Sequence, residues 1–200
     1  MITIVLDADI MSMLFRRCLS SIYRRIMLLI ALNLLFFGGM LVGSLLVGFG
    51  GIQLYDPGAH VLPTDGNLLS LVPCIFFFNL VLSAFVVVTL AGLVFFLLAA
   101  GFLLLRALVW GALITTLSTS EFLFALPTLV LEGEAYVLAA LAGVVLGLSW
   151  LKPEWAYRGK GLSRLEAFKW ALRECAYIYV LVVIILLVSA VVEAVTILLW

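Results

Sequence analysis

The chain has 200 residues, the length of one domain, yet 66% of them are hydrophobic and only 11% are charged. Soluble domains carry about 25% charged residues, and a fold of this size has too little interior to bury so much apolar surface. The composition excludes an ordinary soluble domain and predicts an all-α, polytopic bundle of transmembrane helices. The formal net charge of zero decides nothing, because the charges are segregated along the chain.

The first apolar run, 26–50, is long enough for a membrane span, which needs about 20 apolar residues. It exceeds the apolar core of a signal peptide and no small-residue cleavage site follows it, so we expect it to be retained. Residues 1–25 before it are predicted to form an amphipathic helix at the membrane surface. Its apolar face is defined by residues at helical spacing: Phe15, Cys18, Leu19, Ile22 and Ile26.

The longest apolar stretch, 68–117, is too long for one span. A single helix of that length, at about 1.5 Å per residue, would be more than twice as long as the roughly 30 Å hydrocarbon core is thick. The stretch must therefore fold back, and we expect spans at 68–91 and 93–117. No charged residue marks the turn, so the candidates are Gly92 and Gly101.

Two further spans are predicted at 122–150 and 175–200, and the fourth begins at Phe122 or Pro127. The charged segment 151–174 between them is predicted to be a cytoplasmic amphipathic segment at the lipid headgroups. It contains a capping box, Ser163-Arg164-Leu165-Glu166, which is typical of a helix start.

The distribution of basic residues supports five spans. Ten of the eleven Lys and Arg residues precede the first span or lie between the last two. Cytoplasmic loops carry the excess of basic residues in membrane proteins, so both segments are expected in the cytoplasm. An even number of crossings must separate them, which four spans provide. We therefore predict a multi-pass protein of the cell membrane with a cytoplasmic N-terminus.

Small residues predict where helices approach closely. Gly39 and Gly43 in the first span have GxxxG spacing, as do Gly143 and Gly147 in the fourth. Such pairs let two backbones come into contact within a membrane. Packing inside one bundle is the favoured interpretation, and a homodimer interface is the alternative.

Ionisable residues at membrane depth are functional candidates, because burying a charge in lipid is unfavourable. The spans contain Arg106, Glu132, Glu134 and Glu193, together with the polar Asn79. The three carboxylates are expected at a similar depth, and Arg106 is the one intramembrane cation available to pair with them. Residues two apart on a helix cannot both face one neighbour, so the two glutamates of the fourth span should diverge. The group locks the bundle, forms a proton or cation site, or makes a polar groove for a partner.

The sequence favours neither an enzyme nor a bound cofactor or metal. It has no nucleotide-binding loop, nucleophile elbow, HExxH or CxxC motif, and nothing in it predicts nucleic-acid binding. The cysteines Cys18, Cys74 and Cys175 have no metal-ligand or disulfide-framework spacing. A loop with one histidine and two acids, His60, Asp56 and Asp65, is too sparse to predict a metal site.

Several motifs together resemble the stage II sporulation protein M family of membrane proteins. The second span begins with aromatic residues before Asn79, where the family tends to have an asparagine pair. The fourth carries 126–132, Leu-Pro-Thr-Leu-Val-Leu-Glu, similar to the family's Leu-Pro-His-Gly-x-x-Glu. A charged helix, 165–174, then leads to a last span with Glu193, like the family's glutamate near the C-terminus. Thr128 and Leu129 depart from the family's histidine and glycine.

The resemblance implies a non-enzymatic membrane scaffold or assembly subunit that anchors protein partners, as family members do for cell-wall hydrolases in sporulating bacteria. Membrane lipids and protein partners in the membrane are the expected contacts. The alternative is a small transporter, channel or permease subunit that uses the intramembrane carboxylates.

Overall fold

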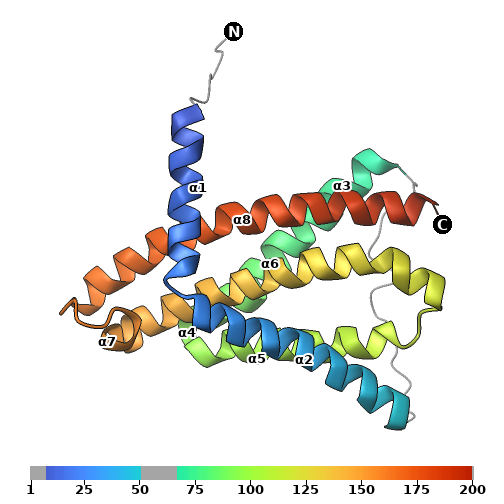
Figure 1. Ribbon diagram of the computed structural model, residues 1–200, viewed down its shortest axis with the longest axis horizontal. Helices are drawn as coiled ribbons and strands as arrows, with labels where there is room; N and C mark the ends of the chain where they lie inside the picture. The colour runs from blue at the N-terminus through green and yellow to red at the C-terminus, as the bar shows by residue number, and fades with distance from the viewer. Residues whose placement is uncertain (1–7, 51–66, 200) are drawn as a thin grey trace.

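The computed structural model describes residues 8–50 and 67–199, and this part of the chain is a bundle of helices without strands (Figure 1). The predicted all-α class is confirmed. Five helical segments are long and apolar enough to cross a membrane, as predicted. They cover Ile26–Phe49, Leu68–Val94, Phe96–Ile114, Thr119–Leu151 and Arg164–Leu199.

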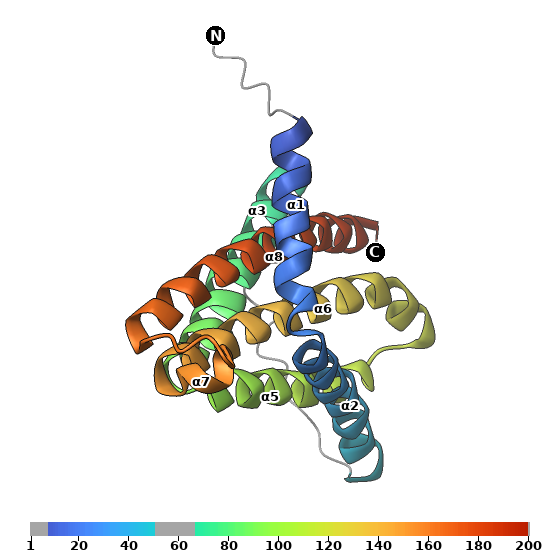
Figure 2. The same ribbon diagram turned by 60° about the vertical axis from the view of Figure 1, so that its left-hand side comes forward.

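The N-terminal helix α1, Ala8–Tyr23, runs across the general direction of the spans in both views (Figures 1 and 2). Cys18 and Ser21 are buried on one side of α1, which packs against α8. An Arg17 guanidinium nitrogen donates to the Tyr177 hydroxyl at 3.0 Å. A short turn then leads to α2, Ile26–Gly50, the first span. This crosswise orientation is the one expected of a helix at a membrane surface.

The second span is built from three pieces: α3 (Leu68–Phe77), the π-helix η1 (Phe78–Leu90) and α4 (Ala91–Val94). Asn67 caps α3, because its side-chain oxygen accepts from the Leu69 amide at 3.0 Å. In η1 the buried positions recur every four to five residues, as the i→i+5 hydrogen bonding of a π-helix favours. They are Asn79, Ser83, Ala84, Val88 and Thr89.

The turn between the second and third spans lies at Phe95, so its prediction at Gly92 or Gly101 was wrong. Phe95 alone is extended, with φ −151° and ψ 119°, and α5 begins at the next residue and covers Phe96–Ile114. Gly92 lies within α4 and is buried, whereas Gly101 is exposed in α5. The second span therefore ends at Val94 and the third begins at Phe96.

The fourth span, α6 (Thr119–Leu151), begins earlier than predicted and is the most deeply buried helix. A capping box starts it: the Ser118 amide donates to the Glu121 carboxylate at 2.6 Å, and the Glu121 amide donates to Ser118 Oγ at 3.3 Å. Pro127 lies inside the helix and does not start it. Small residues between 139 and 147 let other spans pack closely around α6.

The last long helix, α8 (Arg164–Leu199), follows a short helix, α7 (Pro153–Ala156). The predicted capping box is present, since the Ser163 amide donates to the Glu166 carboxylate at 3.0 Å. The predicted boundary at 174/175 is wrong, because α8 runs through it without a break. The amphipathic part of 151–174 is thus the first turns of the last span and not a separate surface helix.

Glycines set the closest contacts between the spans. Gly43 lies against the backbone of Leu108 in α5, and Gly111 of α5 lies against the backbone of Met40 in α2. Gly39 faces Ala107 on the same seam. A methyl group at any of these three positions would overlap a neighbouring atom. The backbones of α2 and α5 therefore approach each other more closely than any residue with a side chain would allow.

The second glycine pair joins α6 to the break after α4. Gly143 contacts the backbone of Thr89, and Gly147 contacts the backbone of Gly92 and Phe96. Both predicted GxxxG pairs are therefore used for packing inside one chain. The homodimer stays a prediction.

Candidate functional site

A chain of buried hydrogen bonds joins three spans inside the bundle. Arg106 of α5 donates to the Tyr136 hydroxyl of α6 at 2.8 Å. The Tyr136 hydroxyl donates to Asn79 Oδ1 of η1 at 2.8 Å, and Asn79 Nδ2 donates to Glu132 Oε1 of α6 at 2.5 Å. Tyr136 is fully buried, and Asn79 and Glu132 are 7% and 5% exposed. We call these four residues the polar core.

Glu193 extends the polar core to α8. Its carboxyl group interacts with that of Glu132, so two acids from different spans lie side by side. Glu134 turns away from this group, and its side chain interacts with Asn33 of α2. The two glutamates of α6 thus diverge, as their spacing predicts.

Arg106 forms no direct ion pair with a carboxylate in the described part of the chain and instead donates a hydrogen bond to the Tyr136 hydroxyl. The ion pairs found in the described part of the chain belong to other arginines. The Arg106 guanidinium lies 3.9 Å from the Tyr136 ring centre and 5.0 Å from that of Trp110, in cation–π contact with both. Hydrogen bonds through Tyr136 and Asn79 connect it to Glu132.

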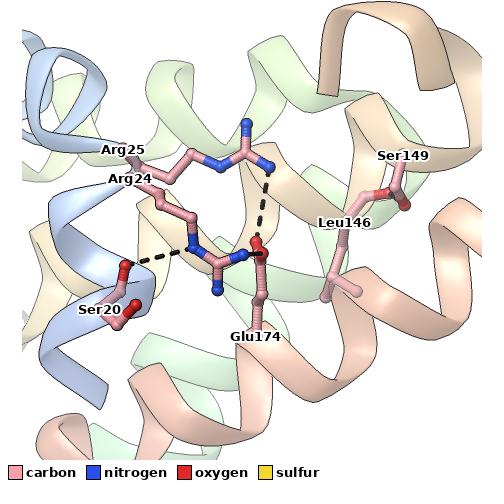
Figure 3. A network of polar contacts seen from close by, with 6 residues as sticks. All are labelled: Ser20, Arg24, Arg25, Leu146, Ser149 and Glu174. Carbon is pink, nitrogen blue, oxygen red and sulfur yellow. Dashed lines mark hydrogen bonds and ion pairs between the residues drawn. The ribbon is translucent and has the colours of Figure 1, made fainter. Parts of the chain in front are cut away.

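A second polar cluster ties the α1–α2 junction to α8, through Arg24, Arg25 and Glu174 (Figure 3). Glu174 of α8 is buried and forms ion pairs with Arg24 at 3.3 Å and with Arg25 at 3.5 Å. Arg25 also lies 5.0 Å from the Tyr157 ring centre. Burial, and after it the charge of Glu174, raise the pKa of Tyr157, so its phenol stays protonated.

Sequence reasoning missed the residues that connect these groups. Tyr136 is uncharged and sits in an apolar stretch, and the only hint was that a buried tyrosine hydroxyl usually needs a partner. Thr89 is another such case: it donates to the Ala139 carbonyl at 2.9 Å and shares a 2.6 Å hydrogen bond with Tyr179. Glu174 was assigned to a surface segment, although it directly precedes the predicted start of the last span at 175.

The described residues contain no group of three or more His, Cys, Asp or Glu side chains that would hold a metal ion. Cys18, Cys74 and Cys175 are free thiols. The loop with His60, Asp56 and Asp65 lies outside the described residues. Each member of the polar core is hydrogen-bonded to another member.

Five apolar spans make this chain a multi-pass helical membrane protein, and a hydrogen-bonded polar core links three of the spans. No family model matches the chain, and no curated protein and no solved structure matches it either.

Proposed function

We propose that the protein is a non-enzymatic membrane scaffold or assembly subunit of the cell membrane. The observation that supports this most is the pairing within the polar core: Arg106, Tyr136, Asn79 and Glu132 bond to one another and link separate spans. Polar groups used in this way fix the arrangement of helices, which a scaffold needs. The resemblance to the stage II sporulation protein M family points to the same role.

The surface for partners is the outward face of α2, the span at the edge of the bundle (Figure 2). It packs mainly along α5, which leaves a continuous row of large apolar side chains on its other side. These side chains are 48–88% exposed: Met27, Ile30, Leu34, Leu41, Leu45 and Phe49. A second protein span could bury this row.

Photo-crosslinking from the two sides of α2 tests the scaffold. A photoreactive residue at Leu34, which is 71% exposed, is expected to trap a discrete protein partner in native membranes. The matched control, at the buried Phe36, should crosslink only within the chain. Mass spectrometry identifies the adduct. If Leu34 traps only lipid or only a second copy of this chain, the scaffold proposal fails.

We also propose that the N-terminus is cytoplasmic, because basic residues gather at the α1–α2 junction and between α6 and α8. A reporter that fluoresces only in the cytoplasm should be bright at the N-terminus and dark at the C-terminus. The reverse pattern would overturn the orientation.

A small transporter is the second candidate, and one observation favours it. Glu132 and Glu193 lie side by side within the spans, next to a π-helix, and both intramembrane acids and π-helices are frequent at functional sites. This candidate requires the purified protein alone to move protons or cations.

A further inference from the structure

A cavity of about 620 Å³ lies at the basic end of the bundle, next to Glu174. Its volume is within the roughly 300–1,000 Å³ range of small-molecule sites. Its polar wall comes from the α1–α2 junction and from the segment after α6. The charged and aromatic side chains that line it are Arg24, Arg25, Trp155, Tyr157, Arg158, Lys160 and Glu174.

The charges in the cavity favour an anion. Four basic side chains face one carboxylate, and that carboxylate is already paired with both Arg24 and Arg25. Figure 3 shows each arginine reaching Glu174 through one nitrogen, with its other terminal nitrogen pointing elsewhere. Arg158 is exposed, so its charge is free to meet a ligand.

The backbone shapes this wall. Gly159 and Gly161 flank Lys160 with φ of 74° and 59°, a left-handed conformation that favours glycine. The resulting turn brings Lys160 to 4.2 Å from the Trp170 ring centre and 5.8 Å from that of Tyr157. Cation–π contact therefore holds the ammonium group at the cavity. The turn therefore holds Lys160 beside the cavity, and its side chain does not extend freely away from it.

The remaining lining is apolar and, apart from Ala156 of α7, belongs to the spans: Ile26, Met27 and Leu28 from the first turn of α2, and Leu148 near the end of α6. Met27 is 80% exposed and Trp155 is 58% exposed, so the cavity borders a surface that faces lipid. A ligand here meets cations at one end and the membrane interior at the other. A free anion would match only the first of these.

We propose that this cavity binds the phosphate headgroup of an anionic phospholipid. Basic pockets beside transmembrane helices have the charge and the depth that such headgroups require. The phosphate lies among Arg25, Arg158 and Lys160, and the acyl chains lie along the start of α2. This inference goes beyond the scaffold function and does not depend on it.

The test measures phosphatidylglycerol binding to the full-length protein by native mass spectrometry, with phosphatidylcholine of the same acyl chains for comparison. The cavity variant combines Arg158→Gln and Lys160→Gln, two exposed residues that take no part in the ion pairs. The matched control combines Lys169→Gln and Arg173→Gln, which remove the same charge from exposed positions of α8 outside the cavity.

We expect the cavity variant to bind phosphatidylglycerol roughly 25-fold more weakly, because each of the two basic residues near an anionic headgroup contributes roughly a fivefold factor. The control should bind as the wild type does. Equal loss in both variants, or equal binding of the two lipids, would overturn the proposal.

Inorganic phosphate is titrated as competitor: if millimolar phosphate displaces the lipid completely, the site is one for free phosphate. A thermal unfolding midpoint near that of the wild type shows that each variant is folded, and Arg158→Gln alone replaces the double variant otherwise.

Discussion

Gly111→Ala is expected to separate α2 from α5 and to lower the free energy of unfolding by about 3 kcal/mol, at the upper end of overpacking effects. The added methyl group would overlap the carbonyl oxygen of Met40 on the facing helix. Backbone atoms cannot rotate away as a side chain can, so the two helices must move apart. Denaturation of the purified protein in detergent or bicelles measures the change.

Gly101→Ala is the matched control on the same helix, because nothing lies within 4 Å of a methyl group there. It should be neutral or up to about 1 kcal/mol more stable, since alanine favours a helix over glycine. Gly43→Ala and Gly38→Ala form the corresponding pair on α2. If Gly111→Ala were as stable as Gly101→Ala, the close contact of α2 with α5 would be wrong.

Asn79→Ala is expected to lower the free energy of unfolding by about 1–3 kcal/mol, the range for leaving buried hydrogen-bonding groups without partners. The substitution removes the acceptor of the Tyr136 hydroxyl and the donor to Glu132. Val81→Ala, at an exposed position of the same helix, is the control and should change stability far less.

A double-mutant cycle identifies the shared hydrogen bond. Tyr136→Phe removes the hydroxyl but keeps the ring under Arg106. Combined with Asn79→Ala, it should be less destabilising than the sum of the two single variants, by about 1 kcal/mol, because both remove the same bond. Additive effects would contradict a connected polar core.

Periodicity and charge predicted the spans because lipid imposes a length and an apolar composition on every crossing helix. The Ser163–Glu166 capping box was readable because it is local. Both GxxxG pairs were found as well, since close approach in a membrane requires small residues. Which helix each pair would contact was not predictable, because that depends on the arrangement of all five spans.

The break at Phe95 could not be predicted, because no residue there favours a turn. The packing of Gly92 against Gly143 and Gly147 sets it, and those contacts come from a span some 50 residues later. The π-helix was missed for a related reason. The spacing of its buried residues resembles that of an irregular α-helix, and only the partners of Asn79 and Thr89 distinguish the two. Arg106 and Glu132 were predicted as site residues because they are charged. Tyr136, the residue that connects them, is neutral and gives no such signal.

The most direct test of the account is ion flux through the purified protein in liposomes. Proton movement is followed with a pH-sensitive dye, and potassium movement with a potassium-sensitive dye, under an imposed membrane potential, for the wild type and for Glu193→Gln. If the polar core holds the bundle together, the wild type will leak no faster than protein-free liposomes, and Glu193→Gln will alter stability alone. Flux above that background, lost in Glu193→Gln while the fold is kept, would contradict the scaffold and establish the transporter.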